Sequence, residues 1–458
     1  MLVHRKQFII DTVPHQITSE WLTTQLQDPY VLSYHTDLTV SSVRLDGRSI
    51  LVLGERLPLS QPMDVEDTIF QSSGRFAVID WPHLLQDTCG QLGIYFYRSG
   101  HRTLCTSSPA LAAEILELPV RDQQFEWPSP INYFLSPGSR VLGLKRLIPD
   151  QTLNIADGQL SAREHQPFKH LDAIEDPVDS LGRALTRVIQ EASELYDTIY
   201  LPLTAGRDSR TLFAALLQTR ADFTAVTQTI GSGPGDTADI EVATKLCKQY
   251  KIRHEVISPL EASHQISLAI PKHTLRSVEN AGSAILIPTR QYDFLADDDV
   301  LLKGGIFEVG RRFFEHMFAS LPSDFSSNGR ALWDCIMPRS IDVDQIESLE
   351  EWRLWRDEHD YGLDLTDSFY IDQDAGAWSA AIEQQLDALP GTSINPVNCA
   401  PALRALLTGD VDVRRKALVQ FEMIRRVDPG LLDIPFNPKS LRYRAKRLAR
   451  RLMARATA

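Results

Sequence analysis

The sequence predicts an α/β protein in two parts: a β-rich region over residues 1–165, and a doubly wound parallel sheet with a helical carboxyl-terminal part over residues 175–458. In the first part, short runs of β-branched and aromatic residues are broken by Gly and Asp-Gly, which is typical of antiparallel strands. In the second part, strand-like and helix-like segments alternate, as in sheets whose parallel strands are joined by helices.

The first part contains several candidate strands and one candidate helix. Strand-like runs lie at residues 38–45 and 49–53. Residues 74–81 and 87–97 are interpreted as a strand, a turn and a second strand, and residues 106–113 as a turn that enters a helix. These segments account for the β-rich assignment.

A change of pattern marks the start of the second part. Residues 164–176 are the predicted linker, and residues 177–190 follow with apolar side chains at helical spacing. The apolar positions of this helix are Val178, Leu181, Leu185, Val188 and Ile189.

Residues 198–217 are the segment around which the second part is organised. An apolar strand-like run leads through a loop with Gly206 into a helix, and Asp208 and Ser209 suit the first turn of that helix. The free N–H groups and the dipole of a helix N-terminus attract anions, and glycine lets a phosphate approach the backbone closely. A carboxylate beside a phosphate needs a metal between them, so Asp208 predicts Mg²⁺.

The alternation continues after this segment. Residues 223–229 predict a strand, residues 236–251 a helix, and residues 253–258 a third strand. Residues 231–235 are rich in glycine but lack the G-x-G-x-x-G spacing, so we interpret them as a loop.

A second strand-to-glycine transition lies in residues 299–314. The apolar run ends at Gly304 and is followed by Glu308, a hard-oxygen ligand suited to Mg²⁺. Arg311 and Arg312 add positive charge for a triphosphate or an acidic substrate.

The remainder is predicted to be mostly helical. Residues 350–430 carry scattered aromatic side chains, which more often form a core than a substrate pocket. The tail from Lys439 has eight Lys and Arg residues and no acid, as in a solvated helix.

Composition excludes some classes of function. The chain of 458 residues has a net charge of −13, which disfavours broad nucleic-acid binding. It has no apolar run of membrane-spanning length, and its amino terminus lacks the apolar core of a signal peptide. Its five cysteines are scattered without a C-x-x-C pair, which favours free thiols and a cytoplasmic location. Oligomeric state stays open.

The loop T-A-G-R-D-S at residues 204–209 resembles the PP-loop S-G-G-x-D-S of the N-type ATP pyrophosphatases. Together with the strand and glycines before Glu308, it is most similar to the synthetase domain of the asparagine synthetase family. Thr204 and Ala205 stand where that family has Ser and Gly. The resemblance implies that Asp208 and Glu308 bind Mg²⁺ and are catalytic, and that Lys439 or Lys446 assists the condensation step. The residues that it assigns to ATP are Leu203, Thr204, Ala205, Gly206, Arg207, Asp208, Ser209, Thr229 and Gly304.

The first part resembles the glutaminase domain of the same family. The similar segments are residues 74–81 with 87–97, residues 106–113, and residues 138–149. That domain is an amino-terminal-nucleophile sandwich that uses a Cys directly after the initiator Met, where this sequence has Leu2. The resemblance therefore implies a glutaminase-like fold without glutaminase activity, as in β-lactam synthetases.

The implied function is an ATP-dependent ligase. It would adenylate the carboxylate of a small molecule or peptide, release pyrophosphate, and condense the acyl-adenylate with an amine without hydrolysing glutamine. One alternative is a ring-closing synthetase of the β-lactam synthetase or lasso-peptide cyclase type. Another is a non-catalytic nucleotide-binding protein, because both loops depart from the family pattern.

Overall fold

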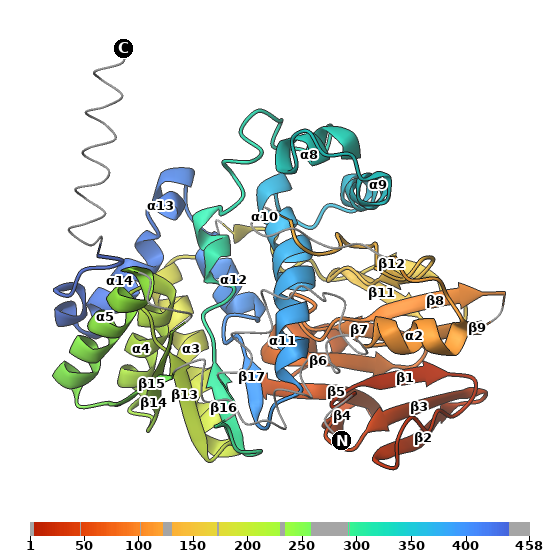
Figure 1. The fold of residues 1–458 in the computed structure, drawn as a ribbon, viewed down its shortest axis with the longest axis horizontal. Coiled ribbons are helices and arrows are strands. Elements are labelled where there is room, and N and C mark those ends of the chain that lie inside the picture. Colours follow the sequence, from red (N-terminus) through yellow and green to blue (C-terminus); the bar gives the residue numbers. More distant parts are fainter. Residues whose placement is uncertain are drawn as a thin grey trace.

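The structure is a computed structural model that describes residues 4–45, 47–100, 102–121, 131–171, 174–229, 234–257, 292 and 294–438. The predictions made for Leu2, Lys439, Lys446 and most of the 231–235 loop fall outside these residues. Figure 1 shows antiparallel sheets formed by the first part of the chain on one side and a parallel sheet with helices on the other.

Two six-stranded antiparallel sheets are formed by the described residues of the first part. The first has the order β10-β8-β9-β1-β3-β2 and consists of β1 (Phe8–Asp11), β2 (Trp21–Gln27), β3 (Tyr30–His35), β8 (Tyr95–Ser99), β9 (Arg102–Thr106) and β10 (Lys145–Arg146). The second has the order β12-β11-β7-β6-β5-β4 and consists of β4 (Val40–Leu45), β5 (Arg48–Pro58), β6 (Ser72–Asp80), β7 (His83–Gln86), β11 (Gln151–Asn154) and β12 (Leu160–Ala162). The predicted strands at residues 38–45, 49–53 and 74–81 are thereby confirmed.

The two antiparallel sheets pack face to face because alternate residues of their strands are apolar. Phe8 and Leu32 of one sheet share a buried cluster with Leu53 and Ile79 of the other. The outer faces are covered by helices α1 (Val65–Phe70) and α2 (Pro109–Leu116), which pack in separate apolar clusters.

A five-stranded sheet in the second part has the order β15-β14-β13-β16-β17, and every printed strand pair in it is parallel. Its strands are β13 (Thr198–Pro202), β14 (Thr224–Gln228), β15 (Arg253–Ile257), β16 (Asp299–Leu302) and β17 (Thr392–Ile394). The first four are the predicted strands, and the predicted parallel sheet is confirmed. β17 was not predicted.

Both faces of β14 and β16 are buried, as expected for inner strands of a parallel sheet, whereas β15 at the edge is partly exposed. Ile199 and Leu201 point into the cluster formed with the helices, whereas Leu301 and Val226 lie in a separate cluster on the other face. The helices of this part are α3 (Pro177–Leu195), α4 (Arg207–Thr219), α5 (Pro234–Tyr250), α8 (Gly329–Ile336), α9 (Val343–Glu358), α10 (Leu365–Phe369), α11 (Ala380–Leu386), α12 (Ala400–Leu407), α13 (Val411–Arg415) and α14 (Leu418–Val427). Two 3₁₀-helices, η3 (Phe307–Arg311) and η5 (Pro429–Leu432), and a π-helix, η4 (Tyr370–Ser379), are the other helical elements among the described residues.

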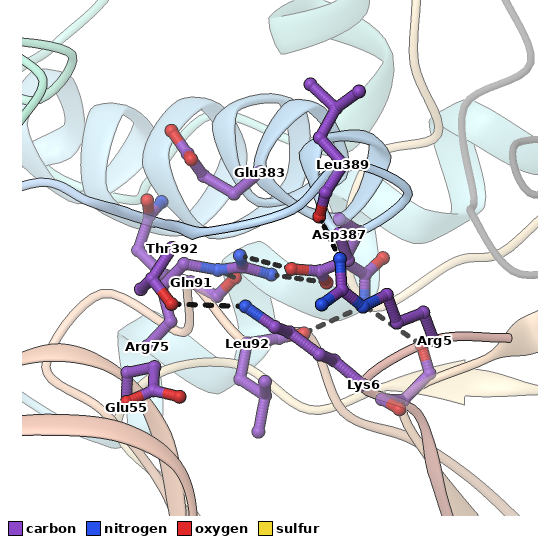
Figure 2. A network of polar contacts seen from close by, with 12 residues as sticks. Arg5, Lys6, Glu55, Arg75, Gln91, Leu92, Glu383, Asp387, Leu389 and Thr392 are labelled. Carbon is purple, nitrogen blue, oxygen red and sulfur yellow. Dashed lines mark hydrogen bonds and ion pairs between the residues drawn. The ribbon is translucent and has the colours of Figure 1, made fainter. Parts of the chain in front are cut away.

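Buried polar contacts join the two parts. Arg75 of β6 forms a two-point ion pair with Asp387, with N–O distances of 2.9 and 3.0 Å. Lys6 Nζ donates to the carbonyl oxygen of Gly391 and to Thr392 at the start of β17. Figure 2 shows these side chains meeting beside the helix that carries Glu383. The parts therefore share an interface at the edge of the parallel sheet that β17 forms.

The predicted linker, residues 164–176, is packed in places. Phe168 is almost fully buried and makes an edge-on ring contact with Tyr361. The predicted boundaries at residues 165 and 175 stay predictions. None of the helices in the described ranges is both long and apolar enough to cross a membrane.

Candidate functional site

The candidate site lies where the chain changes direction across the parallel sheet. From β13 the chain moves to β14 and β15 on one side, and β16 pairs with β13 on the other side. Loops at the carboxyl ends of such neighbouring strands diverge and leave a crevice, which is the usual ligand position in doubly wound sheets. The two predicted loops, residues 203–206 and 303–306, follow β13 and β16 and so meet at this position.

The loop after β13 is held by its own hydroxyl groups and by one distant carboxylate. The Ser209 hydroxyl lies 3.0 Å from the Thr204 hydroxyl and accepts the Thr204 N–H. The Gly206 N–H donates to Thr204 Oγ1, and the Ala205 N–H donates to Asp239 of α5 over 2.7 Å. The Leu203 N–H is bonded to β14. Thr204 and Ser209 therefore set the shape of the loop that the sequence assigns to phosphate.

Helix α4 begins at Arg207 without a side-chain cap. Its N-cap is Gly206, which has no side chain to accept a hydrogen bond from the first turn. Helix α3, by contrast, is capped by Asp176. The first N–H groups of a helix have no intrahelical acceptor. The first turn of α4 therefore presents free donors and the positive end of the helix dipole at the switch point, the place where the chain changes direction across the sheet.

The loop after β16 packs directly against this first turn. A Cβ added to Gly304 would lie 3.3 Å from both the carbonyl carbon and the Cβ of Asp208, and 3.4 Å from the Ser209 nitrogen. The Gly305 N–H donates to Asn395 Oδ1 over 3.1 Å, and the Tyr370 hydroxyl donates to the Gly305 carbonyl oxygen. Two loops almost one hundred residues apart in sequence thus form one surface.

The two predicted metal ligands are joined by a single guanidinium nitrogen. Arg311 Nη2 donates to Asp208 Oδ2 over 2.8 Å and to Glu308 Oε1 over 2.6 Å. The second oxygen of Asp208 accepts a hydrogen bond from Gln420 of α14, also over 2.8 Å. Asp208 and Glu308 are partly exposed, with side-chain accessibilities of 20% and 35%.

Burial and neighbouring charges alter the protonation equilibria of this group. Burial raises the pKa of the Glu308 carboxyl, Arg311 opposes this rise, and Asp208 adds to it. Burial lowers the pKa of the Arg207 guanidinium, and the charge of Arg311 lowers it further. The site therefore holds two carboxylates and two guanidinium groups within electrostatic reach of one another.

Two guanidinium nitrogens at this site have unused donors. Arg207 Nε and Arg311 Nε are both buried, and neither has a hydrogen-bond partner in the described part of the chain. An arginine donates to phosphate or carboxylate oxygens in pairs, so these nitrogens suit an anionic ligand. Arg312 differs, because Glu315, Asp364 and Asp367 surround its guanidinium. Its charge is balanced by protein carboxylates.

The donor set is compatible with a magnesium ion. Asp208 and Glu308 are hard-oxygen donors from separate loops, and the guanidinium between them stands in the place of a cation. Within the described ranges, no group of three or more His, Cys, Asp or Glu side chains is placed to hold a metal. An ion at this position would need water or phosphate oxygens for the rest of its shell.

The remaining predicted residues fall near the same edge or outside the described ranges. Thr229 follows β14, and its N–H and hydroxyl both approach the Ile257 carbonyl oxygen. Lys439 and Lys446 are outside the described ranges, but Asn437 donates to the Ala205 carbonyl oxygen over 3.0 Å. Pattern reasoning missed Asp239, Gln420 and Asn395, because their link to the loops is a tertiary contact that no local motif records.

No protein-family model and no curated protein matches this chain. Among solved structures, the chain is similar to the U34-tRNA thiolase NcsA from Methanococcus maripaludis, determined with its 4Fe-4S cluster. The two are 11% identical, the match covers 43% of this chain and 77% of that chain, and the TM-score is 0.24. A TM-score of this size does not establish a shared fold.

Proposed function

We propose that this protein is an ATP-dependent ligase that adenylates a carboxylate and condenses the acyl-adenylate with an amine. The observation that carries this proposal is the packing of Gly304 against Asp208 and Ser209 at the uncapped start of α4. This arrangement brings three features to one place: a helix N-terminus of the kind that binds phosphate, a glycine that leaves room for a ligand, and two carboxylates. The resemblance to the asparagine synthetase family adds the reaction type.

The residues around the crevice have distinct roles in this proposal. The first-turn N–H groups of α4 and the side chains of Arg207 and Arg311 would bind the phosphates. Asp208 and Glu308 would hold Mg²⁺, which neutralises charge on the departing pyrophosphate when it is bound. Gly304 would let the nucleotide lie against the backbone.

The reaction needs no covalent protein nucleophile. A substrate carboxylate oxygen attacks the α-phosphorus of ATP, and the bond from that phosphorus to the bridging oxygen of pyrophosphate breaks. The amine nitrogen then attacks the acyl carbon, AMP leaves with the bonding electrons, and the amine loses one proton. Positioning and electrostatic stabilisation supply the acceleration.

Nitrogen is proposed to come from the amine itself and not from glutamine. The two antiparallel sheets of the first part support the proposal of a glutaminase-like domain. Four of the five cysteines also suit this proposal, because burial raises the pKa of the thiols of Cys89 and Cys105, and raises the pKa of those of Cys247 and Cys399 to about 12. A buried thiol with a raised pKa is a poor nucleophile.

The lysine predicted to assist condensation is proposed to be Lys439 or Lys446. Arg210 donates to the carbonyl oxygens of Leu431 and Pro435, and its guanidinium lies 3.8 Å from the centre of the Phe436 ring. Asn437, two residues before Lys439, is bonded to the loop at Ala205. These contacts bring the chain to the edge of the phosphate loop, which supports the proposal.

The test is pyrophosphate release from Mg²⁺ and ATP with pooled carboxylates, with ammonium or glutamine added separately. The proposal predicts AMP and pyrophosphate with ammonium and no added stimulation by glutamine. Asp208→Asn should abolish the release, whereas Asp222→Asn, at an exposed position beyond the other end of α4, should not change it. Stimulation by glutamine would refute the loss of glutaminase activity, and ATP binding without pyrophosphate from any pool would favour a non-catalytic protein.

A further inference from the structure

Arg311 lies where the two proposed metal ligands converge. One of its nitrogens, Nη2, donates to both carboxylates, at 2.8 Å for Asp208 and 2.6 Å for Glu308. The other oxygen of Asp208 already accepts a hydrogen bond from Gln420. In this state, therefore, both oxygens of Asp208 and one oxygen of Glu308 are engaged by N–H donors.

The local charges are also balanced without a metal. Asp208 and Glu308 contribute two negative charges, and Arg207 and Arg311 contribute two positive charges that act on each other and on both carboxylates. Within these four side chains, a divalent cation would meet two guanidinium groups and no net negative charge. Repulsion between like charges in a partly buried site is strong, so the resting group disfavours a free metal ion.

Arg311 does not use all of its N–H donors within the described part of the protein, which distinguishes it from a structural ion pair. Its Nε is buried without a partner in the described part of the chain, and its side chain is 22% exposed. The adjacent Arg312 shows the alternative, because its Nε and both Nη atoms face three different carboxylates. Arg311 thus retains donors for an incoming anion, whereas Arg312 does not.

We propose that Arg311 blocks the Asp208–Glu308 pair against free divalent cations, and that a bound triphosphate removes the block. Phosphate oxygens accept from the guanidinium, Arg311 leaves the carboxylates, and the metal binds together with the nucleotide. This inference rests on the proposed function, since it assumes a nucleotide at this site. It adds an order of binding: the metal does not occupy the pair before the triphosphate does.

The test measures Mn²⁺ binding by the loss of the free-ion electron paramagnetic resonance signal, with no turnover required. Without nucleotide, the unmodified protein should bind Mn²⁺ at least about tenfold more weakly than the Arg311→Met variant, which keeps the length of the stem and removes the charge. Arg311→Lys, which keeps a positive charge, should stay close to the unmodified protein. Asp208→Asn in the Arg311→Met background should abolish the gained affinity, which assigns it to the carboxylate pair.

The same experiment with a non-hydrolysable ATP analogue completes the test. The analogue should raise the Mn²⁺ affinity of the unmodified protein. It should raise the affinity of Arg311→Met only slightly, because that variant already binds Mn²⁺ more tightly without nucleotide. Equal Mn²⁺ affinity of the unmodified protein and Arg311→Met without nucleotide would overturn the block. If Arg311→Met gains Mn²⁺ affinity but no variant binds the analogue, the block stands and the proposed function fails. Thermal unfolding curves of each variant verify that the protein is folded during the measurement.

Discussion

Charged side chains are used differently at the interface between the two parts and at the switch-point crevice. At the interface, Arg75 and Asp387 are almost fully buried and bonded at two points, and the remaining Arg75 nitrogen approaches the Gln91 carbonyl oxygen. At the crevice, one nitrogen of Arg311, Nη2, donates to two carboxylates, and its Nε has no partner among the described residues. Both are ionic groups, but only the first is complete within the protein.

The difference indicates which group contributes to stability and which to ligand binding. A buried ion pair whose donors are all satisfied has no free donor for a ligand. Removing one partner leaves the other as an unpaired buried charge, which destabilises the folded state. A partly exposed group with unused donors stabilises the fold little and is available to an anion.

The largest effect is expected at the crevice, on activity. Asp208→Asn should lower pyrophosphate formation by about a thousandfold, the scale expected when a charge-stabilising group is lost. Its free energy of unfolding, measured in urea, should change by less than about 1 kcal/mol because the residue is partly exposed. An unaltered rate would remove Asp208 from the mechanism.

The next largest effect is expected at the interface, on stability. Arg75→Met should lower the free energy of unfolding by about 3–5 kcal/mol, because Asp387 is left as an unpaired buried charge. The matched control is Arg48→Met, since Arg48 pairs with Asp80 at the surface over 3.0 Å, and should cost less than about 1 kcal/mol. Similar losses for both variants would contradict the contrast.

A smaller effect is expected at Asn395, which connects the two regions. Its amide nitrogen donates to Gln91 Oε1 and Glu383 Oε1, and its oxygen accepts the Gly305 N–H. Asn395→Leu should raise KM for ATP by about tenfold through the displaced glycine loop, with a smaller change in kcat. Asn395→Asp retains the acceptor for Gly305 and should recover part of that affinity. A proportional loss of kcat at constant KM would mean that Asn395 does not act through the nucleotide loop.

A further effect is expected on the pH dependence of stability. Burial raises the pKa of the half-buried Asp374 to about 8, and Glu308 adds to this rise, against an ordinary value of 3.8. The folded state therefore binds this proton more strongly than the unfolded state, and stability should fall as pH rises from about 4 to about 8. Asp374→Asn should remove about 2 kcal/mol of this fall, after allowance for the solvent contact of the side chain. Urea unfolding of both proteins at pH 5 and pH 8 measures the difference, and equal slopes would contradict it.

The strands β13 and β16 could be predicted because their apolar runs are visible in the local sequence. β17 was missed because it depends on pairing with a strand that is distant in sequence. The apolar runs that became β13 and β16 are short and uninterrupted, and Gly206 and Gly304 follow them in the next loop. β17 has three residues in a helical region and exists because Val300, Leu301 and Leu302 pair with it. So short a segment carries no periodicity, and its partner is almost one hundred residues away.

The same distinction applies to the candidate site. Gly206, Asp208, Gly304 and Glu308 were predicted because helix starts and glycine turns are local patterns, although their chemical roles stay predictions. Gln420 lies on another helix, and its contact with Asp208 forms only after the chain has packed. The sharing of Arg311 between two carboxylates is likewise a property of the tertiary structure.

The proposed site can be tested by a crystal structure with Mg²⁺ and a non-hydrolysable ATP analogue. We expect phosphates at the first turn of α4, contacts from Arg207 and Arg311 to phosphate oxygens, and a metal bound to Asp208 and Glu308. A nucleotide bound elsewhere, or phosphates at α4 with Arg311 still between the two carboxylates, would contradict it.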